Sequence, residues 1–232
     1  MRDESKGVGL CAPAVAPERV ARSAAALPVS LAVRDLAKGY GARGLFRGVG
    51  FELAPGQSLA VTGPNGSGKS TLLRILCGLA RPTRGVVEYR IAGRPATARE
   101  RRSLIGLVAP DLVLYDELTA VENLRFFARV RGLRRAEGAL AHLLAEVGLG
   151  GRGDDLVGTY SSGMRQRLKY AFALLHRPPI LFLDEPTANL DEAGTLFVRE
   201  CIARQRATGI LVVATNEREE LRYGDRVLRL GG

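Results

Sequence analysis

The stretch VTGPNGSGKST at residues 61–71 decides the fold, because it fits the pattern G-x-x-x-x-G-K-[ST] of loops that hold phosphate groups. Its glycines let the backbone curl until the N–H groups point inward, and the helix expected to begin near Lys69 adds the positive end of its dipole. Lys69 would reach the β- and γ-phosphates of a nucleotide, and the Ser70 hydroxyl would bind Mg²⁺. The residues expected to contact the nucleotide are Gly63, Pro64, Asn65, Gly66, Ser67, Gly68, Lys69, Ser70 and Thr71.

The setting of this phosphate loop (residues 63–71) argues against a chance match. The apolar segment QSLAVT (57–62) predicts a buried strand before the loop, and KSTLLRILCGL (69–79) predicts a helix after it, closed by Gly78. Such loops serve kinases, GTPases, motors and transporters alike, so the rest of the sequence must show how the nucleotide is used.

Composition places the 232-residue chain among ordinary globular proteins, since 46% of its residues are hydrophobic and 25% are charged. The longest apolar runs, such as GILVVATN (209–216), are too short to cross a bilayer. The three cysteines lie far apart without a C-x-x-C pair, so reduced thiols are expected rather than a disulfide or metal site. The two histidines have no partners at ligand spacing, which argues against metal catalysis by imidazole.

The net charge of +10 allows a nucleic-acid or membrane-surface interpretation. Lysine stands only at positions 6, 38, 69 and 169, so the charge is almost entirely arginine, a bias typical of a GC-rich genome. One group of arginines is interpreted as a solvated or membrane-facing surface, with a nucleic-acid site as the alternative. Its members are Arg99, Arg101, Arg102, Arg125, Arg129, Arg131, Arg134 and Arg135.

The order of patterns along the chain predicts an α/β fold. Residues 1–29 mix charge, proline and alanine without a period, which predicts a disordered N-terminal extension. Short strands are expected at 30–36 and 48–54, around the turn-rich GYGARG, as a small antiparallel part. Apolar strands then alternate with helices, which predicts a mostly parallel central sheet covered on both faces. A helical block at about 107–170 is expected to form an inserted subdomain.

A second motif, ILFLDEPT (180–187), supplies acidic groups. Its apolar residues place Asp184 at the carboxyl end of a buried strand, which is where parallel sheets bind ligands. There Asp184 can hold Mg²⁺ and Glu185 can polarise an attacking water. The alternative is that two adjacent acids cap a loop, and the following PTANLD argues against it.

Three separated motifs in this order resemble the ATP-binding cassette (ABC) ATPases. They are the phosphate loop, YSSGMRQRLKYAFALL (160–175) and DEPTANLD (184–191), and the likeness covers roughly residues 31–230. The resemblance implies a P-loop NTPase fold of the ABC type over residues 30–232. It also implies an ATPase that binds ATP and Mg²⁺ and uses Glu185 in hydrolysis.

The resemblance also assigns roles to residues outside the phosphate loop. Small residues before a helix leave N–H groups and a serine hydroxyl free for a γ-phosphate, and in the family this γ-phosphate belongs to the opposite subunit of a head-to-tail dimer. The residues concerned are Ser161, Ser162 and Gly163. Tyr40 falls where the family stacks an aromatic ring on adenine, with ordinary packing as the alternative.

Three positions depart from the family pattern. Pro110 stands where a glutamine normally touches Mg²⁺ and the attacking water, and proline offers no side-chain donor or acceptor, although Asp111 is adjacent. Asn216 stands at the position of the switch histidine, where it is the candidate for contact with the γ-phosphate. Ser162 replaces a usual glycine. Hydrolysis is therefore expected to be slow or differently gated.

The chain carries one cassette, so the resemblance implies a separate ATPase subunit. It would dock through its helical subdomain on integral-membrane permease subunits, at the cytoplasmic face of the inner (cell) membrane, and form a homodimer or pair with another cassette. It is similar to haem-exporter ATPases of cytochrome c maturation and to export ATPases for other substrates. The alternatives are an ATP-gated dimerisation module that hydrolyses slowly, or a nucleic-acid-associated cassette. No specific nucleic-acid partner is expected.

Overall fold

The computed structural model describes residues 28–41, 43–135 and 137–231. The predicted disordered extension therefore lies outside the described residues, except for its last two positions. Of these, Val29 already begins the first strand.

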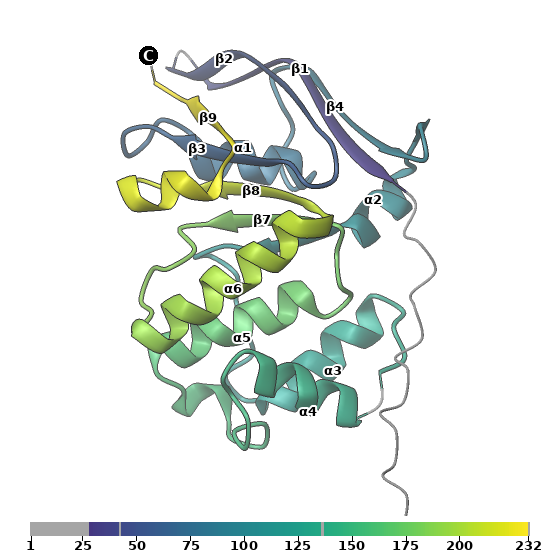
Figure 1. Ribbon diagram of the computed structural model, residues 1–232, viewed down its shortest axis with the longest axis vertical. Helices are drawn as coiled ribbons and strands as arrows, with labels where there is room; N and C mark the ends of the chain where they lie inside the picture. The colour runs from purple at the N-terminus through teal and green to yellow at the C-terminus, as the bar shows by residue number, and fades with distance from the viewer. Residues whose placement is uncertain (1–27, 42, 136, 232) are drawn as a thin grey trace, which may run out of the picture.

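A parallel sheet forms the middle layer of the described chain (Figure 1). Its strands stand in the order β6-β7-β8-β3-β9, and every adjacent pair is parallel. This is the central sheet that the apolar segments predict. The bounds are β3 Ser58–Thr62, β6 Ile105–Val108, β7 Ile180–Asp184, β8 Ile210–Ala214 and β9 Arg226–Arg229.

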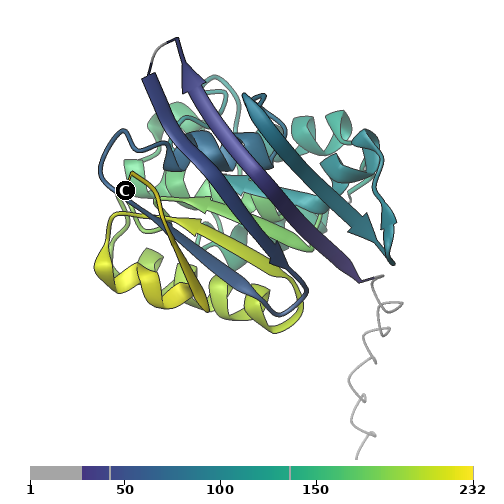
Figure 2. The same ribbon diagram turned by 90° about the horizontal axis from the view of Figure 1, so that it is seen from above.

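An antiparallel sheet covers one face of the parallel sheet, in the order β2-β1-β4-β5. Figure 2 shows its long strands lying side by side above the rest of the molecule. The first two strands are much longer than the sequence suggests, since they continue into GYGARG and pair Tyr40 with Arg43. The bounds are β1 Val29–Tyr40, β2 Arg43–Leu53, β4 Arg84–Ile91 and β5 Arg94–Pro95.

Helices complete the layers. Helix α1 lies between the two sheets, and α3 to α6 cover the opposite face of the parallel sheet (Figure 1). Helices α2 and α6 have no counterpart among the sequence-based expectations, although Thr97 and Glu100 form a capping box at the start of α2. The bounds are α1 Lys69–Leu76, α2 Ala98–Leu104, α3 Ala120–Val130, α4 Glu137–Glu146, α5 Ser162–Leu174 and α6 Glu192–Thr208, with 3₁₀ turns η1 Val157–Thr159 and η2 Arg218–Tyr223.

Alternate residues of the central strands serve two hydrophobic clusters. In β7, Phe182 packs toward α1 and the antiparallel sheet, whereas Leu181 and Leu183 pack toward the helices. Because both faces are buried, these strands carry uninterrupted apolar sequence. Polar side chains therefore stand at the ends of these strands, and the candidate functional site lies there.

Candidate functional site

The polar residues singled out in the sequence follow neighbouring strands of the parallel sheet. The phosphate loop follows β3, Asp184 ends β7, Asn216 follows β8 and Pro110 follows β6. Because parallel strands share one carboxyl edge, these segments meet at the same edge of the sheet. The structure thereby brings together groups from widely separated parts of the sequence.

The phosphate loop owes its shape to glycine. Gly63, Gly66 and Gly68 have φ angles of 151°, 79° and 100°, which side chains disfavour. A Cβ atom on Gly63 would lie 2.3 Å from the carbonyl oxygen of Leu230, so no larger residue fits there. Gly68 precedes α1 without a capping side chain, and the first N–H groups of that helix have no intrahelical acceptor. This arrangement can bind an anion.

The ammonium group of Lys69 is buried against the same loop. Its Nζ donates to the carbonyl oxygen of Gly63 at 2.9 Å and to that of Pro64 at 3.3 Å. Only 7% of the residue is exposed. The lysine thus holds its positive charge over the loop, where the β- and γ-phosphates are expected.

Asp184 fits a magnesium ligand. Its side chain is 4% exposed, and its Oδ1 atom has no hydrogen-bond partner among the described residues. Burial raises the pKa of its carboxyl group, while the hydrogen bond from Ser70 acts in the opposite direction. A buried carboxylate oxygen beside a serine hydroxyl is the hard oxygen donor set that Mg²⁺ prefers. Asp184 and Ser70 would hold the ion.

Replacement of Asp184 with asparagine is expected to raise the melting temperature of the apo chain at pH 7 while abolishing Mg²⁺ binding. The native pKa of this carboxyl is raised, so its ionisation above that pKa opposes folding, and asparagine carries no charge to desolvate. Thermal melts at pH 7 with and without Mg-ADP measure both effects. A lower melting temperature for the apo variant would contradict this account of Asp184.

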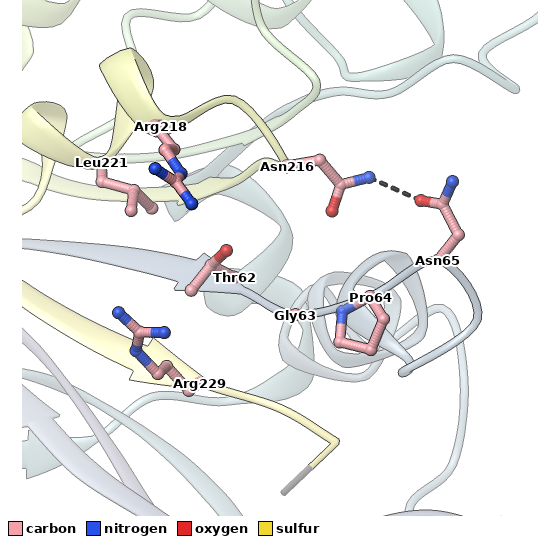
Figure 3. Close-up of a pocket in the computed structure, with 8 residues that line it drawn as sticks. All are labelled: Thr62, Gly63, Pro64, Asn65, Asn216, Arg218, Leu221 and Arg229. Atoms are coloured by element: carbon pink, nitrogen blue, oxygen red, sulfur yellow. Dashed lines mark hydrogen bonds between the residues drawn. The ribbon is translucent and has the colours of Figure 1, made fainter.

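Glu185 and Asn216 are the two further polar residues of the candidate site, in addition to Asp184 and Ser70. Glu185 is exposed and has a φ angle of +52°, and its N–H donates to the carbonyl oxygen of Ala214 at 2.9 Å. The Nδ2 atom of Asn216 donates to Oδ1 of Asn65 at 2.5 Å, at the tip of the phosphate loop (Figure 3). The contact between these two asparagines had no sequence signal, because they lie 151 positions apart.

Pro110 contributes a backbone contact that ties the segment after β6 to a helix. Its carbonyl oxygen accepts a hydrogen bond at 2.6 Å from Nζ of Lys169, on α5. The adjacent Asp111 forms an ion pair at 2.8 Å with Arg74, on α1. The segment after β6 is therefore tied to two helices, although proline offers no polar side chain. Neither contact was expected from the sequence.

The remaining predicted residues lie outside the pocket beside the phosphate loop. Ser161 caps α5 by accepting from the N–H of Met164 at 3.2 Å, Ser162 is exposed, and a Cβ on Gly163 would lie 3.2 Å from the carbonyl oxygen of Asn189. Tyr40 is 58% exposed, and the ammonium of Lys38 stands 4.4 Å from its ring centre. Tyr40 and Ser162 therefore stand on the surface of the described chain rather than in a closed site.

The comparisons with known proteins agree with this geometry. The family model described as ABC transporter matches residues 46–188, which is more than half of the chain. The chain belongs to the ABC transporter family. The solved structure titled as the ATP binding subunit of an ABC transporter superposes with a TM-score of 0.76 at 32% identity, covering 87% of this chain and 88% of that one. The P-loop fold of the ABC type is thus confirmed, including its antiparallel N-terminal sheet.

Several curated relatives are similar at comparable levels. The lipoprotein-releasing system ATP-binding protein LolD of Koribacter versatilis is 40% identical over 80% of this chain and 87% of its own length. The cytochrome c biogenesis ATP-binding export protein CcmA 2 of Cupriavidus metallidurans is 38% identical, over 81% and 90%. The linearmycin resistance ATP-binding protein LnrL of Bacillus subtilis is 35% identical over 80% of this chain. That match covers 60% of the length of LnrL.

A bacterial Atm1-family ABC exporter with ATP bound also superposes, with a TM-score of 0.72 and 25% identity. The match covers 94% of this chain and 39% of the exporter. Within the described residues of this ABC transporter chain, each helix is too short or too polar to span a membrane.

Proposed function

We propose that this ABC family chain binds ATP with Mg²⁺, hydrolyses it and powers export through separate membrane subunits. The observation that carries the proposal is the meeting, at one sheet edge, of the phosphate loop with Lys69, the buried Asp184 with its neighbour Ser70, and Glu185. Phosphate release by the purified chain, compared with the Glu185→Gln variant, tests hydrolysis. Equal rates for the two proteins would contradict the role of Glu185.

Each residue has a distinct role in the proposed hydrolysis. The N–H groups of the phosphate loop and the ammonium of Lys69 orient the β- and γ-phosphates, and Glu185 accepts a proton from the attacking water. Ser70 and Asp184 would hold Mg²⁺, which would supply positive charge to offset that of the phosphate oxygens. Asn216 donates to the γ-phosphate through its amide. Glu185 is exposed, so a water molecule can reach its carboxylate.

Partner binding is assigned to the helical subdomain at about 107–170. Five large apolar side chains are exposed there, and the Tyr115 and Phe126 rings pack edge to face with centres 5.3 Å apart. An exposed apolar cluster of this size fits a protein partner. We assign the integral-membrane permease to it, which places the chain at the cytoplasmic face of the cell membrane. The cluster is centred on Tyr115 and Phe126, and Val113, Val130 and Leu156 are the other large apolar side chains exposed in the subdomain.

Glu185→Gln is expected to form a dimer that persists in Mg-ATP, because Ser161, Ser162 and Gly163 do not line the pocket beside the phosphate loop of their own chain and would meet ATP on a second one. Size-exclusion chromatography with light scattering, with and without Mg-ATP, measures the effect. Glu185→Gln combined with Lys69→Ala is the matched control and is expected to remain monomeric. A single variant that binds ATP yet stays monomeric would contradict the head-to-tail arrangement.

The transported substrate is proposed from the names of the similar relatives. The similar relatives are named for linearmycin resistance, lantibiotic transport, lipoprotein release and cytochrome c biogenesis. We propose export as the shared direction and haem as one candidate substrate. Co-purification of the tagged chain with its membrane partner, followed by haem-stimulated ATPase assays in liposomes, tests it. Absence of stimulation by haem would remove that candidate.

A slow ATP-gated dimerisation module is the second candidate function. It is favoured by Pro110, which lacks a polar side chain, and by Asn216, which cannot gain a proton near neutral pH. Hydrolysis in the ATP-bound dimer would then be slower than dimer dissociation. Single-turnover measurements on preformed dimers distinguish this module from a transport motor.

A further inference from the structure

A cavity of about 600 Å³ opens beside the phosphate loop, on its outer side (Figure 3). One wall is the backbone of Gly63 and Pro64, and another is formed by Thr62 and Arg229, which are paired across β3 and β9. The turn η2 closes it with Arg218 and Leu221. Cavities of this volume hold small molecules.

Two guanidinium groups give this cavity its charge. Arg218 comes from η2 and Arg229 from the edge strand β9, and Figure 3 shows both side chains directed toward the space around Thr62. Among the described residues that line the cavity, these two carry a charge. Neither has a hydrogen-bond or ion-pair partner in the described part of the chain. Two unpaired guanidinium groups beside a hydroxyl favour an anionic ligand.

The neighbouring arginines of the same elements behave differently. Arg222 of η2 lies over the ring of Tyr223, with its guanidinium carbon 5.8 Å from the ring centre. Arg226 of β9 donates to the carbonyl oxygen of Glu52 at 3.2 Å. Neither lines the cavity. Of the arginines compared in η2 and β9, Arg218 and Arg229 are therefore the two that line the cavity.

The cavity is separate from the ATP site assigned above. Gly66 to Thr71, Asp184 and Glu185 do not line it, and Lys69 directs its ammonium to carbonyl oxygens within the loop. The two sites share the segment from Gly63 to Asn65 and the side chain of Asn216. The hydrogen bond from Asn216 to Asn65 stands at the boundary between them.

We infer that this cavity is a second anion site, which binds a small ligand with at least two anionic oxygens, of phosphate or carboxylate type. Arg218 and Arg229 bind the oxygens from opposite sides, the Thr62 hydroxyl adds a donor, and Leu221 contacts the apolar part.

The test is calorimetric titration of the full chain with pyrophosphate and, separately, with malonate, after the ATP site has been saturated with Mg-ADP. We expect one equivalent of at least one probe to bind. Arg218→Gln combined with Arg229→Gln is expected to weaken that binding by about 10²-fold, since removal of each charge-assisted hydrogen bond weakens binding roughly tenfold. Pyrophosphate against malonate distinguishes a phosphate from a carboxylate ligand.

Arg222→Gln combined with Arg226→Gln is the matched control, because it removes the same charge from the same two elements. It is expected to bind the probe within about threefold of the unmodified chain, a spread that surface changes of about 0.5 kcal/mol produce. An equal weakening in both double variants, or no binding of either probe to the Mg-ADP-saturated chain, would overturn the inference. Mg-ADP affinity is measured in each variant, so a failed ATP site is recognised independently.

Discussion

Lys69→Ala is expected to weaken ATP binding by on the order of 10²-fold and to reduce turnover to background. The substitution removes the buried ammonium that lies over the phosphate loop and leaves the carbonyl oxygens of Gly63 and Pro64 without their donor. Charge-assisted hydrogen bonds to phosphate contribute about 1.5–3 kcal/mol each, which accounts for an effect of this size. Turnover falls further, because the same charge stabilises the transferring phosphoryl group.

Fluorescent-ATP binding and phosphate release measure the two effects separately. Arg199→Ala, which removes one exposed positive charge from α6, is the control and is expected to match the unmodified chain. Lys69→Arg keeps the charge but brings a larger planar group into a buried position, so it is expected to restore little activity. An alanine variant that binds ATP within a few-fold of the unmodified chain would show that the phosphate-loop assignment is wrong.

The fold could be predicted from local patterns because its central strands are buried on both faces. Segments such as ILFLD and ILVVA carry no polar residue before their ends, so strand identity and carboxyl-end position were both visible. The lengths of β1 and β2 were not visible in the sequence, because the two strands pair through a glycine-rich segment that locally favours a turn. Helix α6 lacked a clear apolar period because it mixes buried Phe197 and Val198 with charged neighbours.

The phosphate loop and Asp184 were visible in the sequence because each is determined by contiguous residues. The contacts of Asn65 with Asn216 and of Pro110 with Lys169 depend on which strands and helices become neighbours in space. Arg229 could not be singled out from the sequence either, because nothing local distinguishes it from the many other arginines. Only its pairing with Thr62 at the end of β9 places it at a cavity.

Asn216→Ala is expected to lower the rate of ATP hydrolysis by on the order of 10²–10³-fold, the usual effect when one donor to a transition-state oxygen is removed. The amide already faces the tip of the phosphate loop, where its Nδ2 atom donates to Asn65. A γ-phosphate that replaces Asn65 as acceptor would receive this donor without a change of backbone. Asn216→His is expected to keep or raise the rate and to add a pH dependence near neutrality, because imidazole titrates there and an amide does not.

Asn65→Ala separates a catalytic amide from one that only positions the loop. If Asn216 acts on the γ-phosphate, removal of its resting partner leaves the donor in place, and the rate falls far less than in Asn216→Ala. If the asparagine pair merely holds the loop in shape, both substitutions break the same 2.5 Å hydrogen bond and reduce the rate equally. Steady-state rates of the two variants, with Glu185→Gln as the inactive control, decide between these outcomes. Hydrolysis by Asn216→Ala at the unmodified rate would exclude a catalytic amide and favour the slow dimerisation module.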